Sequence, residues 1–431
     1  MYQLYNLLLL MSTLFLVPYY LFLGVRHGKS RRGIRERLGY YTREQLDLVQ
    51  NLPVIWIHAV SVGEARAALP LIKALRRDYP DHRMVMTNVT ETGHATALEN
   101  PLIDVCLFFP FDFSWTVRKA LEQVQPRLIL IVETEIWPNF IREAWRKKIP
   151  MILVNGRLSD RSFPRYKKAR LLLKPILQRI TFFCMQSQQD KERMIALGAS
   201  GERADNTGNL KFDHELIEVT EDGVDRLKHR YRIPDNLRLL VAGSTHQGEE
   251  QQLIAAYRDL LDRSDDALAM VLIPRHPERR REVQEILAKL SIPARLRSEL
   301  TDDSPLLAAG EVLIGDTLGE VMDFYSMADL VFVGGSLVPV GGHNLLEAAL
   351  VAKPVVFGPY IHNFREISAK LVAAGAGIKV DSQEQLVASC LAMLKDSSRR
   401  RIMGEAGRSL IVDNAGATQR TMTHISRYLN R

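Results

Sequence analysis

Short apolar runs alternate with helix-like stretches along most of this chain, an arrangement typical of parallel β-sheets whose faces are covered by helices. Each run has the length of a buried strand and ends at polar or glycine residues. The predicted strands are residues 54–57, 83–87, 128–132, 151–154 and 182–185 in the first half, and 239–242, 270–273, 312–314, 330–333 and 354–357 in the second. The pattern predicts two α/β domains, for which 431 residues are sufficient.

The alternation is interrupted by the segment Gly208–Asp213, which precedes a charged helix expected at Asp222–Tyr231. We therefore predict an N-terminal domain, a linker and a C-terminal domain over residues 26–210, 211–236 and 237–431. A last helix is expected from about Ile411 to Leu429, crossing back toward the first domain.

The N-terminus has a different character. Leu4–Leu23 is a stretch of about 20 mostly apolar residues, the length that crosses a bilayer. A basic cluster follows it directly: Arg26, Lys29, Arg31, Arg32, Arg35 and Arg37. Such a cluster holds the chain that follows it on the cytoplasmic side. A cleaved signal peptide is disfavoured, because no basic region precedes the apolar run. Residues 1–25 are thus predicted to be one membrane anchor.

The formal net charge of +7 favours an anionic partner. Nucleic acid is disfavoured because a recognised binding motif with interleaved aromatic residues is missing. Beside a membrane anchor, anionic lipid headgroups or a phosphorylated lipid substrate fit the charge better. The three cysteines lack metal-ligand spacing and indicate reduced core thiols.

A glycine-rich turn follows the predicted strand 330–333 and leads into a helix at Asn344–Glu347. Glycines let the backbone approach a ligand, and the N–H groups of a helix start suit a phosphate. Asn344 and Glu347 are three residues apart and share one face, where the carboxylate could accept bonds from a ribose diol. The alternative is a tight loop that closes an α/β unit.

Other polar loops of the second half also follow the carboxyl ends of strands, where open α/β sheets bind ligands. Arginine suits bidentate phosphate recognition, and no Asp-x-Asp pair or His and Cys cluster indicates a metal. The candidate nucleotide-binding residues are Ser244, Thr245, Arg275, His276, Pro277, Gly315, Asp316, Thr317, Gly319, Glu320, Gly341, Gly342, His343, Asn344 and Glu347.

In the first half, Glu64 follows strand 54–57 and opens a helix expected to run to about Arg77. We expect the helix dipole to lower the pKa of Glu64 and keep it ionised, which suits a base that accepts a proton from an attacking hydroxyl. The alternative is structural: Ser61-x-x-Glu64 matches a capping box. Periodicity alone leaves both open.

Glu133 and Glu135 follow the apolar strand 128–132, ahead of Pro138. Carboxylates at the end of a buried strand indicate a role in positioning an acceptor or holding a basic residue. An ion pair that ties loops together is the alternative.

Taken together, the motifs resemble the 3-deoxy-D-manno-octulosonic acid (Kdo) transferases over essentially the whole chain. The motifs concerned are His58-Ala-Val-Ser-Val-Gly-Glu64, Glu133-Thr-Glu-Ile-Trp-Pro138, Gly208-Asn-Leu-Lys-Phe-Asp213, Arg275-His-Pro277, Gly315-Asp-Thr-x-Gly-Glu320 and Gly341-Gly-His-Asn-x-x-Glu347.

The resemblance implies a GT-B fold, in which two Rossmann-like domains face a cleft. It also implies transfer of Kdo from CMP-Kdo to a lipid A precursor at the cytoplasmic side of the bacterial inner membrane. From the residues themselves we expect no cofactor or metal, and we hypothesise that the transfer inverts the anomeric carbon. By motif, Glu64 corresponds to the catalytic glutamate, and Glu133 and Glu135 match a functional segment. The acceptor-binding candidates are Arg35, Arg37, Ser61 and Arg157.

Two other functions remain possible from the sequence. One is a GT-B enzyme that uses a UDP-sugar, since a glycine-rich loop followed by a glutamate suits many nucleotides. The other is a non-catalytic, membrane-anchored lipid-binding protein, which leaves the polar loops of the second half without a role.

Overall fold

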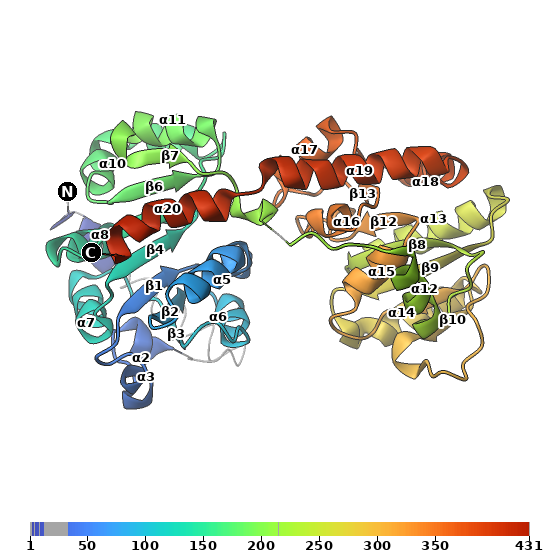
Figure 1. Ribbon diagram of the computed structural model, residues 1–431, viewed down its shortest axis with the longest axis horizontal. Helices are drawn as coiled ribbons and strands as arrows, with labels where there is room; N and C mark the ends of the chain where they lie inside the picture. Colours follow the sequence, from blue (N-terminus) through green and yellow to red (C-terminus); the bar gives the residue numbers. More distant parts are fainter. Residues whose placement is uncertain (1, 4, 8, 13–32, 214, 431) are drawn as a thin grey trace. The chain divides into compact units, whose positions relative to one another are not determined.

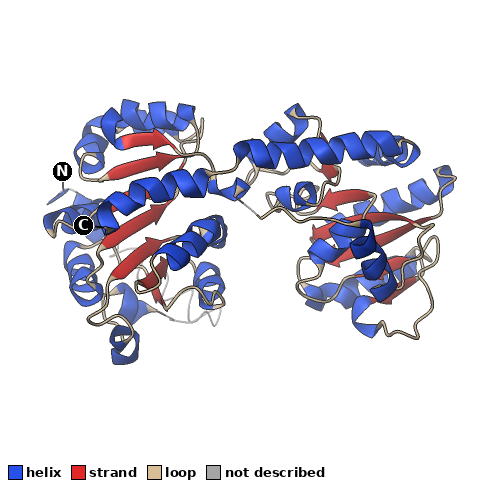
Figure 2. Cartoon of the chain, in the orientation of Figure 1, coloured by secondary structure: helices blue, strands red, loops and turns tan. Residues whose placement is uncertain are grey.

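The computed structural model describes residues 2–3, 5–7, 9–12, 33–213 and 215–430. The chain divides into two compact units (Figures 1 and 2). Unit 1 comprises residues 1–213 and 414–431, and unit 2 comprises residues 214–413. The charged helix expected in the linker is α12 (Glu221–Arg230) and belongs to unit 2.

Unit 1 is built on a parallel sheet with the strand order β3-β2-β1-β4-β5-β6-β7. Its strands are β1 (Val54–His58), β2 (Arg83–Asn88), β3 (Val105–Phe108), β4 (Leu128–Val132), β5 (Met151–Gly156), β6 (Phe182–Met185) and β7 (Ala204–Asn206). The order reverses between β1 and β4, which pair in parallel. Ligands of doubly wound sheets bind beyond the strand ends at such a switch point.

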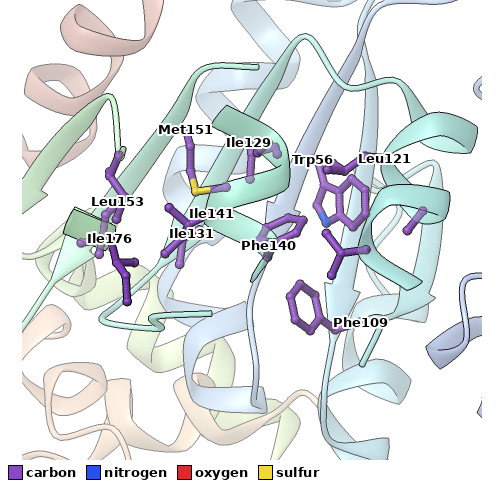
Figure 3. Close-up of a cluster of buried hydrophobic side chains, with 14 of the residues drawn as sticks. Trp56, Phe109, Leu121, Ile129, Ile131, Phe140, Ile141, Met151, Leu153 and Ile176 are labelled. Carbon is purple, nitrogen blue, oxygen red and sulfur yellow. The ribbon is translucent and has the colours of Figure 1, made fainter. Parts of the chain in front are cut away.

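Helices cover both faces of this sheet. They are α2 (Ile34–Arg37), α3 (Arg43–Asp47), α4 (Val62–Ala67), α5 (Leu69–Asp78), α6 (Glu91–Leu98), α7 (Ser114–Val124), α8 (Pro138–Arg146), α9 (Phe163–Lys168), α10 (Arg170–Leu177), α11 (Gln188–Leu197) and α20 (Ala417–Leu429). On one face, Trp56 and Ile129 pack with Phe140 of α8 (Figure 3). On the other face, Ile57 belongs to a cluster with Ile425 of α20. Alternate residues of each strand therefore fill two cores.

The prediction of one continuous helix from Glu64 to about Arg77 is wrong. It is divided into α4 and α5 at Ala68, two residues before Pro70. Proline lacks an N–H and is accepted in the first turn of a helix, so it starts α5 rather than continuing α4.

The predicted last helix is also divided. α19 (Ser397–Asn414) ends before Gly416, which has a φ of +89° and precedes α20. Glycine adopts this conformation without a Cβ penalty. The carboxylate of Asp213 accepts N–H groups from Gly416 (2.7 Å), Ala417 (3.2 Å) and Thr418. Figure 1 shows the red α20 among the blue and green elements of unit 1, and it packs against α5.

Unit 2 has a second parallel sheet, with the strand order β10-β11-β9-β8-β12-β13-β14. Its strands are β8 (Arg238–Thr245), β9 (Leu268–Pro274), β10 (Ala294–Leu296), β11 (Val312–Ile314), β12 (Leu330–Val333), β13 (Val355–Phe357) and β14 (Gly377–Lys379). The other helices of the unit are α13 (Glu249–Arg263), α14 (Arg280–Lys289), α15 (Val321–Met327), α16 (Leu346–Leu350), α17 (Arg365–Ala373) and α18 (Gln383–Lys395). The switch point lies between β8 and β12. The prediction of two parallel-sheet α/β domains is confirmed.

The predicted membrane anchor falls largely on residues 13–25, which lie outside the described residues. Among the residues that the structure does describe, no helix combines the length and hydropathy needed to cross a bilayer. Nearer the N-terminus, Tyr5 donates its hydroxyl to Asp112 at 2.8 Å, and Arg179 donates to the hydroxyl of Tyr2 at 3.0 Å. These contacts join the first residues to unit 1.

Candidate active site

Two of the predicted catalytic carboxylates lie at the switch point of unit 1. Glu64 is in the first turn of α4, which follows β1, and Glu133 directly follows β4. Since β1 and β4 are neighbours in the sheet, the sequence motifs on these loops are brought to one edge. Glu133 has a φ of +59°, a left-handed conformation that costs about 1–3 kcal/mol in a residue other than glycine and is frequent at functional sites.

The side chain of Glu64 is buried, with 8% of its surface exposed. Its Oε2 accepts the N–H of Val60 at 2.5 Å, and its Oε1 accepts the hydroxyl of Ser61 at 3.3 Å. Ser61 is the N-cap residue of α4, but its side chain accepts no backbone N–H of the helix. The pair is therefore not a capping box, in which Ser61 would accept the N–H of Glu64. Instead, Ser61 orients the carboxylate.

The expectation that Glu64 has a lowered pKa is wrong. Burial raises its pKa to about 8, although the hydrogen bond from Val60 lowers it, and the charges of Glu133 and Glu135 raise it further. Burial removes water from the ionised form, and α4 has only six residues with which to offset this cost. Burial also raises the pKa of Glu135 to about 7, with Glu133 contributing. The three carboxylates thus form an interacting acidic cluster.

Two basic residues lie beside this acidic cluster. The Nζ of Lys211 is 3.4 Å from Oε1 of Glu133. The backbone N–H of Arg157 donates to the hydroxyl of Thr134 at 2.9 Å, which places the backbone of the predicted acceptor residue Arg157 beside the loop between Glu133 and Glu135. Lys211 lies in the sequence motif Gly208–Asp213, but its partner Glu133 is 78 residues away, so the motif alone indicates no role for it.

His58, in the same motif as Glu64, is not part of the acidic cluster. Its Nδ1 lies 3.0 Å from the hydroxyl of Thr87, and its ring stacks on Phe109 at 3.9 Å between centroids. Burial lowers the pKa of His58 to about 3, so the ring is neutral at physiological pH. Of the other acceptor candidates, Arg37 donates to the carbonyl of Val89 at 2.6 Å and Arg35 is exposed.

At the switch point of unit 2, the loops that follow β8 and β12 are joined by Glu249, a residue that the sequence analysis did not select. Its carboxylate has no exposed surface and accepts backbone N–H groups from both loops. Thr245 is buried at the end of β8, and Ser244 has a left-handed φ of +58°. No local pattern could reveal Glu249, because its partners on the second loop are 86 to 88 residues away.

Three histidines meet near these loops. The Nε2 atoms of His246 and His343 are 2.7 Å apart, and their rings are nearly parallel. The ring of His276 lies edge-on to His246, with 6.0 Å between centroids. Burial lowers the pKa of His246, and its electrostatic interactions with His276, Arg275 and Arg279 lower it further. His246 is therefore neutral at physiological pH and acts as a hydrogen-bonding group.

The remaining nucleotide candidates differ in their accessibility. Asn344 donates to Glu347 at 3.3 Å, so these two residues meet as the helical spacing predicts. Gly341 and Gly342 donate their N–H groups to the carbonyl of Gly335. Arg275 is partly buried and His276 is exposed, and Pro277 begins a 3-10 turn.

The two acidic candidates of the unit, in contrast, are engaged by basic residues. Asp316 is paired with Arg280 at 3.2 Å and also accepts the hydroxyl of Ser298. Glu320 accepts two bonds from Arg297 and also accepts the hydroxyl of Thr317. Gly319, between them, has a φ of +85°, and Gly315 lies against Ile273. These ion pairs tie the loop after β11 to the rest of unit 2.

Comparison with known proteins agrees with this arrangement. Residues 32–214 match the family described as 3-deoxy-D-manno-octulosonic-acid transferase (kdotransferase). The 3-deoxy-D-manno-octulosonic acid transferase of Haemophilus influenzae is 33% identical over 99% of this chain and 98% of its own length. This chain belongs to the Kdo transferase family. A second Kdo transferase, from Chlamydophila psittaci, is 30% identical over 99% of this chain and 96% of its own.

The C-terminal half of this Kdo transferase family member also matches a wider group, glycosyl transferases group 1, over residues 306–410. Among solved structures, the UDP-GlcNAc 2-epimerase from Neisseria meningitidis covers 87% of this chain and all of its own, with a TM-score of 0.57 at 14% identity. At this identity the likeness concerns the fold alone. The fold is GT-B-like, and the chain is a glycosyltransferase.

Proposed function

We propose that this protein transfers Kdo from CMP-Kdo to a lipid A precursor, as the first steps of lipopolysaccharide core synthesis require. The observation that supports it best is the buried Glu64 at the switch point of unit 1, in a chain that belongs to the Kdo transferase family. A general base works best when its pKa is close to the working pH, and burial brings the pKa of Glu64 to about 8.

In the proposed reaction, ionised Glu64 accepts the proton of an acceptor hydroxyl. The hydroxyl oxygen then forms a bond to the anomeric carbon of Kdo from the side opposite to the CMP oxygen, while the bond to that oxygen breaks. CMP leaves with the electron pair, and the configuration of the sugar is inverted. Ser61 and the N–H of Val60 hold the carboxylate in position.

Glu133 and Glu135 have a supporting role in this proposal. Burial is the main reason that the pKa of Glu64 is raised, and their charges raise it further, while Glu133 holds Lys211 beside the acidic cluster. Lys211 and Arg157 then supply positive charge for the phosphates of the acceptor.

Unit 2 is proposed to hold the donor. The nucleotide-binding candidates lie beyond the carboxyl ends of its strands: Arg275, His276, His343 and Asn344 on loops, and Glu347 in the first turn of α16. Arg275 and the histidines would stabilise the departing phosphate without a metal ion, since the charge that develops there is small enough for hydrogen bonds and one arginine.

We also propose attachment to the cytoplasmic face of the inner membrane through the predicted anchor, residues 1–25. A described surface supports contact with lipid: α9 and α10 carry Arg165, Lys167, Lys168 and Lys174, and Leu171 between them is 89% exposed. Basic residues of this kind bind anionic headgroups with about 1 kcal/mol each.

The test is a product assay with purified full-length protein, CMP-Kdo and a tetra-acylated lipid A precursor, read by mass spectrometry with and without EDTA. A mass gain of one or more Kdo units in both samples is expected. Product only without EDTA would contradict the metal-independent mechanism. Competition by UDP but not by CMP would contradict the donor, and acceptor binding without any product would favour a lipid-binding protein.

A further inference from the structure

The carboxylate of Glu249 is bound entirely by backbone N–H groups. Its Oε1 accepts the N–H groups of Ser336 (3.0 Å) and Leu337 (2.8 Å). Its Oε2 accepts those of Gly335 (2.7 Å) and His246 (3.2 Å). Glu249 is the first residue of α13 and has no exposed surface.

A loop whose successive N–H groups converge on one point is an anion-binding nest, a device that commonly holds phosphate. Here the anion in the nest is the protein's own carboxylate. The N–H groups of Gly335, Ser336 and Leu337 are therefore already used, and those of Gly341 and Gly342 donate to the carbonyl of Gly335. A phosphate could reach these amides only by displacing a fully buried charge, which is costly.

The same interaction fixes the two histidines of the switch point. Glu249 binds the N–H of His246 directly, and it binds Gly335, whose φ is +68°. A Cβ on Gly335 would lie 3.0 Å from Cδ2 of His343 and 3.4 Å from Cδ2 of His246, so the loop backbone packs against both rings. The position of the histidine pair thus depends on the position of the loop.

We propose that Glu249 is a positioning residue for the donor: it occupies the glycine-rich nest so that the donor phosphate is recognised by the His246–His343 pair instead of by the loop amides. This proposal rests on the proposed function, because it assumes that unit 2 binds the nucleotide. It departs from the expectation that the glycine amides hold the phosphate.

The test compares Glu249→Gln with a matched control in the full-length protein. Glu311→Gln is a suitable control, because Glu311 is also buried, pairs with Arg295 at 2.5 Å, and precedes β11 at the opposite end of the sheet. The dissociation constant of CMP is measured by calorimetry, and KM is measured for CMP-Kdo and for the acceptor.

For Glu249→Gln we expect the dissociation constant of CMP and the KM for CMP-Kdo to rise about tenfold, with the KM for the acceptor unchanged. The reason is that the NH2 group of glutamine replaces one carboxylate oxygen, so two N–H groups of the loops face a donor instead of an acceptor. Hydrogen exchange at Gly335, Ser336 and Leu337 should become faster. Glu311→Gln should leave CMP binding unchanged. If Glu249→Gln does not fold, Glu249→Asp, which keeps the charge but shortens its reach, should show the same changes to a smaller extent.

Two results would overturn the proposal. If the loop amides bind phosphate, removing the competing carboxylate will leave CMP binding unchanged or tighten it. Unchanged hydrogen exchange at the loop amides would show that Glu249 does not hold them. If the wild-type protein binds no CMP, the proposed function fails as well. Binding of CMP by the wild type therefore distinguishes a failure of the Glu249 proposal alone from a failure of the proposed function.

Discussion

The two units have buried acidic residues at equivalent positions, but these residues are surrounded by different groups. Each sheet has a switch point, and the helix that follows the first strand of each sheet has a buried acidic first turn, with Glu64 in unit 1 and Glu249 and Glu250 in unit 2. In unit 1, Glu64 faces two other carboxylates and has a raised pKa of about 8. In unit 2, Glu249 is bound by four N–H groups, and Glu250 is paired with Arg279 at 2.7 Å.

Burial raises the pKa of Glu249 as well, but its four N–H donors act in the opposite direction, whereas Glu64 has one such donor and two neighbouring carboxylates that raise its pKa further. A carboxylate that lacks full compensation for its burial titrates near neutral pH, which is what proton transfer needs. A carboxylate surrounded by N–H donors or an arginine is held in place and gives the loop its shape. We infer that unit 1 carries the acid–base chemistry and that the acidic residues of unit 2 build the binding surface.

Replacing the titrating carboxylate should have the largest effect. Glu64→Gln keeps the shape of the side chain but cannot accept a proton, so kcat should fall by about 10²- to 10⁴-fold. Steady-state kinetics with CMP-Kdo checks this, with the exposed Glu99→Gln as the control. CMP binding should not change, and near-wild-type turnover would show that Glu64 is not the base.

The next effect concerns stability in unit 2. Arg279→Met leaves the carboxylate of Glu250 buried without its cation, which should lower the free energy of unfolding by about 3–5 kcal/mol. Urea unfolding measures it, and the exposed Arg281→Met, two residues further along the chain in α14, should change stability by less than about 0.5 kcal/mol. Equal effects of the two variants would contradict the structural role of Glu250.

The pH dependence of activity should follow the ionisation of Glu64 in unit 1. Because only the ionised form of Glu64 accepts a proton, kcat/KM should rise about tenfold per pH unit and level off near pH 8. Glu135→Gln removes a negative charge that raises this pKa, so the midpoint should move to lower pH. A profile that is flat from about pH 6 to pH 8 would contradict the raised pKa.

The smallest effect should be a gain in stability. The pKa of Glu64 is about 8 in the folded protein but about 4.3 when unfolded, so its contribution to stability is complete below about pH 4.3 and is lost as the pH rises to about 8. Glu64→Gln cannot ionise, and its melting temperature should therefore exceed that of the wild type at pH 8, by about 2–4 °C for each kcal/mol of this loss. At pH 4.5 the two should melt together, and a lower melting temperature of the variant at pH 8 would argue against this linkage.

Much of the fold could be predicted because its signals are local. The apolar runs at 128–132 and 330–333 are fully buried strands in the structure, and the spacing of Asn344 and Glu347 predicts their contact. The four edge strands were not predicted. Three of them, β7, β10 and β14, have only three residues each and lack such a run, whereas β3 is apolar but only four residues long.

For the site, the sequence predicts which residues lie on each loop, but not their surroundings or their partners. The pKa of Glu64 depends on how completely the folded chain removes water from it, which its helix position does not reveal. The role of Asp316 depends on Arg280, which lies 36 residues away. Partners of this kind are brought together by the sheet order rather than by sequence spacing.

The contact between Asp213 and the start of α20 has a consequence for biosynthesis. Ile425 and Leu429 of α20 complete a core that also contains Ile55 and Ile57 of the first strand. The ribosome therefore makes all of unit 2 before it supplies the last piece of unit 1. Unit 2 can close its own core during translation, whereas unit 1, although synthesised first, has an exposed apolar face until α20 emerges. A premature stop codon ahead of residue 417 would accordingly damage the N-terminal half of the protein more than the half in which it occurs.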